Sequence, residues 1–75
     1  MKETAKNMPL GHMSYITLEH ETLHSFYFYT LSEVKELFWK FDFPYNPNLK
    51  IKKNFKKLSE FALKNNIVMF YGFYE

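Results

Sequence analysis

Cysteine and arginine are both absent from this 75-residue sequence, and only two glycines are present. Without cysteine, disulfides and thiolate metal sites are excluded, which fits a reducing compartment such as the cytoplasm. Without arginine, the chain lacks the side chain that makes bidentate contacts to guanine edges. The sequence therefore predicts a cytoplasmic protein that does not read a specific duplex sequence.

Long hydrophobic runs and catalytic motifs are also scarce. No stretch of about 18 apolar residues could span a bilayer, and the N-terminus lacks the basic-then-apolar order of a signal peptide. There is no glycine-rich phosphate loop, and neither Ser25 nor Ser59 has an identifiable base. These observations predict a soluble protein that is not an enzyme and has no membrane partner, no cofactor and no small-molecule substrate.

Aromatic residues, in contrast, are abundant: nine phenylalanines, six tyrosines and one tryptophan. A domain of this size buries only about 60% of the surface that its unfolded chain exposes, so its stability is marginal. Each buried aromatic ring removes roughly 150–250 Å² from water. We therefore expect aromatic side chains to form the core of a single domain, which we assign to residues 13–75.

Residues 1–12 show no hydrophobic period and contain Pro9 and Gly11. The tripeptide Gly11-His12-Met13 is typical of a cloning junction, and Met13 could be the native start. We interpret residues 1–12 as a cloning remnant or a disordered tail.

Two segments alternate in the way that strands do, residues 14–20 (SYITLEH) and residues 23–30 (LHSFYFYT). Joined through Glu21-Thr22 they would form a hairpin, although that pair lacks the residue types that tight turns prefer. The alternative is one long helix over residues 17–41, where apolar residues also recur at steps of seven and four. We favour the hairpin, because four consecutive aromatic residues suit a pleated surface better than a helix.

Two helices and a strand follow the hairpin. Ser32 is expected to cap the first helix, which ends before Pro44 because a residue that precedes proline avoids the helical region. Asn46-Pro47 is expected to begin a second helix that runs to Asn65, and Asn65-Asn66 to end it in a left-handed conformation. The buried positions of the second helix are Ile51, Phe55, Leu58 and Ala62. Residues 67–74 then form the last strand.

The expected fold is a small α+β domain of order β-β-α-α-β, in which a three-stranded antiparallel sheet packs on a helical hairpin. We place the strand at residues 26–29 in the middle of the sheet, because it is apolar on both faces, and expect the last strand to run antiparallel to it. The face turned away from the helices then carries four apolar or aromatic residues: Tyr27, Tyr29, Val68 and Phe70. Such a face is typical of a homodimer or partner interface, although its rings could also stack on single-stranded bases.

Charge is divided unevenly along the chain. Residues 13–45 carry two lysines and five carboxylates (net −3), whereas residues 46–66 carry six lysines and one carboxylate (net +5). A basic helix face attracts phosphates, and it is equally the solvated face of an ordinary helix. The candidate residues for binding a partner or nucleic acid on this face are Lys50, Lys53, Lys56, Lys57 and Lys64.

His20-Glu21-Thr22-Leu23-His24 matches the pattern H-E-x-x-H. On a helix, the two histidines of this pattern share one face and can bind Zn²⁺, while the glutamate acts as a general base. The match looks like the motif of the zincin metallopeptidases but covers some ten residues. If the hairpin forms, His20 and His24 straddle a turn and the zinc-binding geometry is lost.

Taken together, these features predict a small interaction module that binds and regulates or inhibits a larger partner, as a monomer or a homodimer. The size and the Lys-, Asn-, Phe- and Tyr-rich composition suggest a viral or mobile-element origin. The contacts would come from the aromatic sheet face and the lysine-rich helix. Nucleic-acid binding through the same lysines is the alternative, and zinc-dependent peptide hydrolysis is the third hypothesis.

Overall fold

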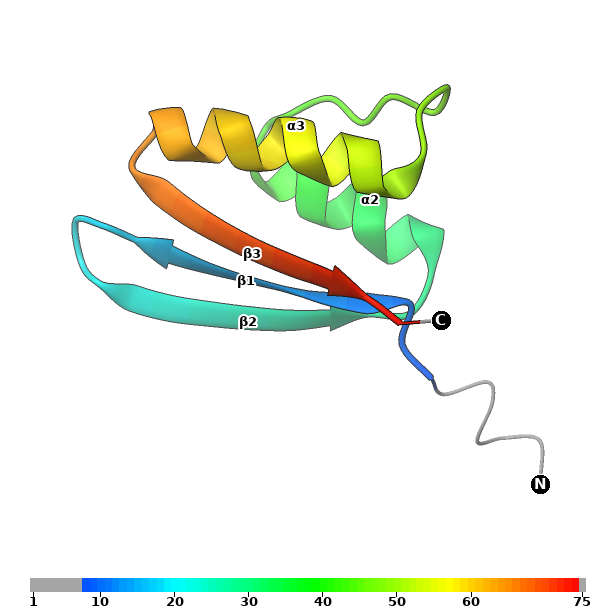
Figure 1. The fold of residues 1–75 in the computed structure, drawn as a ribbon, viewed down its shortest axis with the longest axis horizontal. Coiled ribbons are helices and arrows are strands. Elements are labelled where there is room, and N and C mark those ends of the chain that lie inside the picture. Colours follow the sequence, from blue (N-terminus) through cyan, green and yellow to red (C-terminus); the bar gives the residue numbers. More distant parts are fainter. Residues whose placement is uncertain (1–7, 75) are drawn as a thin grey trace.

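The computed structural model describes residues 8–74, and these form a sheet covered by helices on one face (Figure 1). The elements in order are β1 (Gly11–Thr17), β2 (Thr22–Phe28), α2 (Leu31–Lys40), α3 (Ile51–Lys64) and β3 (Ile67–Phe73). This confirms the predicted α+β class and the order β-β-α-α-β, and it excludes the long helix over residues 17–41. Within residues 8–74, neither helix has the length and apolar character needed to cross a membrane.

The strands are arranged in the order β2-β1-β3, so the first strand lies in the middle of the sheet. β1 pairs antiparallel with both neighbours over all seven of its residues. The expectation that β2 would be central, with the last strand antiparallel to it, is therefore wrong. β2 and β3 are the two edges and run in the same direction.

The connection between the helices explains this order. Residues 41–50 carry the chain back to the end where α2 begins, so α2 and α3 run in the same direction (Figure 1). Strand β3, which follows α3, consequently runs in the same direction as β2. A strand with that direction forms an antiparallel ladder only with β1.

The β1–β2 hairpin has a longer turn than the sequence predicted. Thr17 pairs with Thr22, which leaves residues 18–21 as the turn instead of Glu21-Thr22. Glu21 takes a left-handed φ of 54°, and its backbone N–H donates to the Thr17 carbonyl (2.6 Å). A glutamate therefore occupies the left-handed position that glycine, asparagine or aspartate more often fills.

Helix α2 begins at a capping box two residues before the predicted cap. The Thr30 hydroxyl accepts from the Glu33 N–H, and the Glu33 carboxylate accepts from the Thr30 N–H. Ser32 is thus inside the helix and the prediction that it caps the helix is wrong. The reason is that only Thr30 has a glutamate three residues later that can complete the reciprocal pair.

Helix α3 begins at Ile51, four residues later than the start predicted at Pro47. The Asn46 side chain accepts from the Asn48 N–H (2.9 Å) and so forms a turn instead of a helix cap. The predicted exit is confirmed, because Asn66 has a left-handed φ of 63°.

The side chain of Asn54 holds this connection in place from the first turns of α3. Its Oδ1 accepts from the Asn46 N–H (2.8 Å), and its Nδ2 donates to the carbonyls of Asn46, Leu49 and Lys50 (2.9–3.2 Å). Asn54 is almost completely buried, and a buried amide without partners would destabilise the fold. These bonds therefore determine where the chain turns back into α3.

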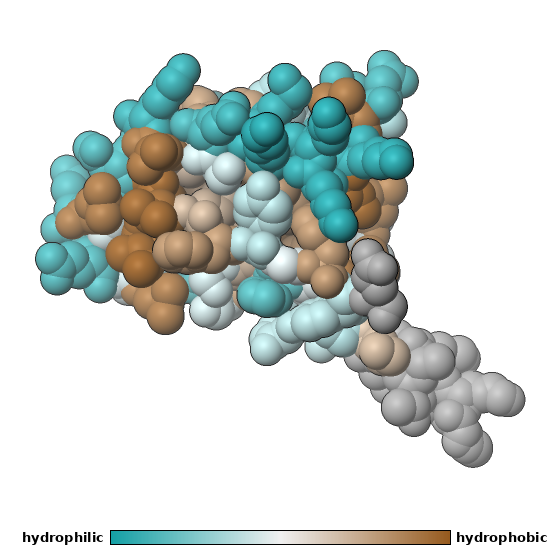
Figure 2. Space-filling view, in the orientation of Figure 1, coloured by the Kyte–Doolittle hydropathy of each residue, from teal (hydrophilic) through white to brown (hydrophobic). Residues whose placement is uncertain are grey.

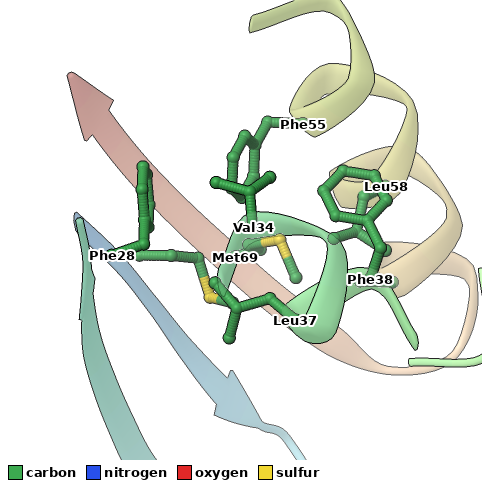
Figure 3. Close-up of a cluster of buried hydrophobic side chains, with 9 residues drawn as sticks. Phe28, Val34, Leu37, Phe38, Phe55, Leu58 and Met69 are labelled. Carbon is green, nitrogen blue, oxygen red and sulfur yellow. The ribbon is translucent and has the colours of Figure 1, made fainter. Parts of the chain in front are cut away.

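The core lies between the sheet and the two helices (Figure 3). Phe55 of α3 is at its centre, with ring centroids 5.4 Å from Phe28, 5.3 Å from Phe38 and 5.3 Å from Tyr71. Rings from both edge strands and both helices thus meet around one side chain. The predicted aromatic core is present, and the remaining fully or nearly buried apolar residues are Met13, Val34, Leu37, Leu58, Ala62 and Met69.

Gly11 begins β1 and is buried, with Phe28 on one side and Phe73 on the other as cross-strand partners. The backbone of Leu10 continues the pairing, donating to the Phe28 carbonyl and accepting from the Tyr74 N–H. The predicted boundary at residue 13 is therefore corrected, because Gly11 and His12 are part of the sheet. Residues 1–7 of the predicted tail lie outside the described residues.

Replacing Gly11 by alanine is expected to destabilise the fold, because the new methyl group would meet the Gly72 carbonyl oxygen and lie 2.8 Å from the Phe28 ring. Overpacking of this kind costs roughly 1–3 kcal/mol. Gly72→Ala is the matched control, since its methyl group would meet only the movable His12 side chain, at 3.0 Å. Urea unfolding of both variants tests this, and equal stabilities would contradict it.

Candidate functional site

The sheet face turned away from the helices, here called the outer face, is formed by alternate residues of all three strands. Cross-strand register places its residues in three rows. The rows, each running from β2 through β1 to β3, are Leu23–Ile16–Val68, Ser25–Ser14–Phe70 and Tyr27–His12–Gly72. No helix of the described chain covers this face, so its side chains face solvent.

The row nearest the β1–β2 turn is entirely aliphatic. Leu23 is 62% exposed, and Leu18, which follows β1 in the turn, is 51% exposed. Figure 2 shows hydrophobic residues gathered at the end of the sheet where β3 begins, next to the hydrophilic surface of α3. The row Leu23–Ile16–Val68, Leu18 in the turn and Phe70, which is 53% exposed, form one apolar patch. Monomeric proteins seldom expose a large contiguous patch without a binding role.

The row at the other end is aromatic and polar. The His12 ring lies 6.0 Å from the Tyr27 ring and 5.8 Å from the Tyr74 ring, and the Tyr74 hydroxyl is 3.2 Å from His12 Nδ1. Partial desolvation, followed by the neighbouring Tyr27 hydroxyl, raises the pKa of Tyr74 above its usual 10.0. The outer face thus combines an aliphatic end with a hydrogen-bonding aromatic end, as interfaces commonly do.

The four residues predicted for this face differ in placement. Tyr27 and Phe70 are on it and exposed, while Val68 is on it and half-buried. Tyr29 is exposed but follows β2, and its backbone N–H donates to the Glu33 carboxylate (2.6 Å) at the start of α2.

Sequence reasoning named Val68 of the aliphatic row but missed the other two members, Ile16 and Leu23. Ile16 and Leu23 have the same strand parity as His12 and Tyr27, and this signal could have identified them. Their pairing became visible only with the register of β1 in the middle of the sheet.

The lysines predicted to bind a partner or nucleic acid are all exposed, at the start of α3 or along it. Lys50, Lys53, Lys57 and Lys64 follow helical steps of three, four and seven, so they form one stripe opposite the buried side of the helix. Lys53, Lys56 and Lys57 surround a hollow of about 270 Å³ that also includes Glu60. The Glu60 carboxylate opposes the binding of an anion there.

The lysine stripe and the outer face lie on opposite sides of the molecule. The buried side of α3, with Phe55, Leu58 and Ala62, faces the sheet, so the stripe points away from it. One flat partner surface therefore cannot contact both. The two surfaces are separate candidates for binding.

The H-E-x-x-H pattern does not form on a helix. His20 is exposed in the hairpin turn, whereas His24 lies in β2 and stacks on Tyr15 with ring centroids 4.7 Å apart. Glu21 is held in the left-handed turn conformation. Over residues 8–74, no three histidine, cysteine or acidic side chains are grouped so that they could hold a metal ion.

Comparisons of the chain with protein-family models, with curated proteins and with solved structures found no match. Function is therefore inferred from the surfaces themselves.

The effect of Tyr27 on Tyr74 is expected to be measurable in an alkaline titration. Because the pKa of Tyr74 is higher in the folded than in the unfolded chain, its stabilising contribution is complete below pH 10.0 and is lost as the pH rises above that value. Replacing Tyr27 by phenylalanine should lower the Tyr74 pKa toward 10.0. Tyr29→Phe is the control and should leave it unchanged. Carbon-13 NMR of labelled tyrosines measures both, and identical Tyr74 titrations in the two variants would contradict the assignment.

Proposed function

We propose that this chain is a small protein-interaction module that binds a larger protein through its outer face. The observation that carries the proposal is the continuous apolar patch of Ile16, Leu18, Leu23, Val68 and Phe70 on a sheet face that no described element covers. A partner surface that covers this patch would remove apolar area from water at about 25 cal/mol per Å².

The neighbouring row that contains Tyr27 and His12, with Tyr74 beside it, would make such a contact specific. Tyr27 is 61% exposed and presents a ring and a hydroxyl side by side, while His12 and Tyr74 are already linked to each other. Aromatic residues with a polar end dominate interface centres because they combine buried area with directed hydrogen bonds. A module that acts in this way changes its partner by covering part of the partner's surface, so the expected role is regulation or inhibition.

Site-specific photo-crosslinking in cells of the source organism tests the proposal. A photoreactive residue at Phe70 should give a defined adduct with one larger protein, whereas the same residue at Lys57 on the far side of the molecule should not. Adding Leu23→Lys to the Phe70 probe should abolish the adduct, because it places a charge in the apolar row. Leu23 is exposed, so the variant should keep its fold, which circular dichroism checks.

Two outcomes would refute the proposal. One is a Phe70 probe that gives no adduct, and the other is an adduct that forms equally from the Lys57 probe. Persistence of the adduct in folded Leu23→Lys protein would show that the apolar row is not the binding surface.

Nucleic-acid binding through α3 is the second candidate, and the stripe of Lys50, Lys53, Lys57 and Lys64 favours it. A helix of 14 residues is about 21 Å long, and lysines along it would contact several phosphates without reading sequence. Two features make nucleic-acid binding less favoured than protein binding through the outer face. Glu60 lies among the lysines, and the chain has no arginine.

Binding to single- or double-stranded oligonucleotides should, on this second hypothesis, weaken steeply between low and moderate salt. The double variant Lys53→Glu/Lys57→Glu should abolish binding, whereas Lys35→Glu on α2 should not. Fluorescence anisotropy measures all three proteins. Absence of binding by the unmodified chain at low salt would eliminate this candidate.

A further inference from the structure

A groove of about 550 Å³ runs along the free edge of β2, between this strand and α2. Apolar side chains line it from both elements, Phe26 and Phe28 from the strand and Leu37 and Trp39 from the helix. Its polar lining consists of Tyr27, Glu33, Glu36 and Lys40. Trp39 is 81% exposed, the highest value among the large hydrophobic residues of the described chain. An exposed indole beside an apolar groove is the type of side chain that anchors protein interfaces.

The strand that forms this groove has no protective feature of an edge strand within its own sequence. β2 (TLHSFYF) has no charged residue and no proline, and its unbroken register with β1 contains no bulge. Edge strands of soluble proteins normally carry at least one of these features, because unpaired N–H and C=O groups otherwise accept a further strand. β2 is therefore suited to pair with another strand on its free side.

The charges along the groove point to the identity of that strand. Glu33 and Glu36 line the first half of α2, and Lys40 lines its last turn. If two copies are related by a two-fold axis, their grooves run in opposite directions. The acidic half of one groove then faces the basic end of the other. The groove is thus electrostatically complementary to itself.

Strand geometry is compatible with the same symmetry. Two copies of one strand pair antiparallel about a two-fold axis that passes opposite one of their residues. Such pairing keeps side chains of the helix-covered face next to one another, and likewise those of the outer face, because strand side chains alternate with a period of two. The helix-covered faces of the two sheets therefore form one continuous face, and the two outer faces form the other.

We propose that two copies of this chain pair β2 to β2 and form one continuous sheet of six strands, three from each copy. The joined grooves bury Trp39 of both copies, and Glu36 of each copy approaches Lys40 of the other. This dimer goes beyond the proposed function and does not rest on it, because Tyr27 is the one residue of the outer face that also lines the groove. It would place two outer faces side by side and so present a partner with twice the binding surface.

Sedimentation of the full chain over a range of concentrations tests the pairing. The unmodified protein should form a dimer, and Trp39→Ala should raise its dissociation constant at least about tenfold, as removal of an interface anchor does. Amide hydrogen exchange in β2 should slow as the protein concentration rises. Phe70→Lys on the outer face should leave the dimer intact, which separates this proposal from the previous one.

A charge-reversal pair gives the sharpest result. Glu36→Lys and Lys40→Glu should each be monomeric alone, because each places like charges opposite one another in both halves of the interface. An equal mixture of the two should dimerise, since every contact then joins opposite charges. Lys57→Glu on α3 is the matched control and should dimerise like the unmodified protein.

Three outcomes would overturn the proposal. The first is an unmodified chain that stays monomeric at every concentration. The second is a mixture of folded Glu36→Lys and Lys40→Glu proteins that does not pair. The third is a dimer that Phe70→Lys dissolves and Trp39→Ala leaves intact, which would transfer self-association to the outer face.

Discussion

Both helices pack on the same face of a three-stranded sheet, and this one-sided covering governs the rest of the molecule. The covered face gathers the aromatic core around Phe55, while the other face keeps Leu23, Tyr27 and Phe70 in solvent. A sheet of three strands has two faces to shield, and residues 8–74 supply helices for one. The open face follows from the placement of both helices on one side, and its apolar character makes it the main candidate for binding.

The covered face is stabilised by few but large contacts. Phe55 touches rings from both edge strands and from α2, so a single helix residue joins the elements that the sheet alone would leave apart. Gly11 lets Phe28 lie close to the middle strand, and Asn54 fixes the connection that leads into α3. This domain is therefore stabilised by buried aromatic rings, by the close approach of strands at Gly11 and by the hydrogen-bonded Asn54 amide. Other small domains use disulfides for the same purpose.

Three surfaces remain available for contacts, and each has a different chemistry. The outer face is apolar and aromatic, and the exposed side of α3 is basic. The β2 edge with Trp39 combines unpaired backbone groups with a groove that is acidic at one end and basic at the other. The basic side points away from the outer face, so lysine attraction and apolar contact cannot serve one flat partner surface. A dimer through the β2 edge would leave both other surfaces free.

The sequence by itself determined the types and the order of the elements, because hydrophobic periods of two and 3.6 depend on local chain geometry. It also located Tyr27 and Phe70 on the open face and the lysines on the exposed side of α3. Only the tertiary structure decided that β1 is central, since strand pairing depends on the direction in which residues 41–50 return the chain. The central position of β1 joins Leu23, Ile16 and Val68 into one row and leaves β2 with a free edge, and no local pattern contains either pairing.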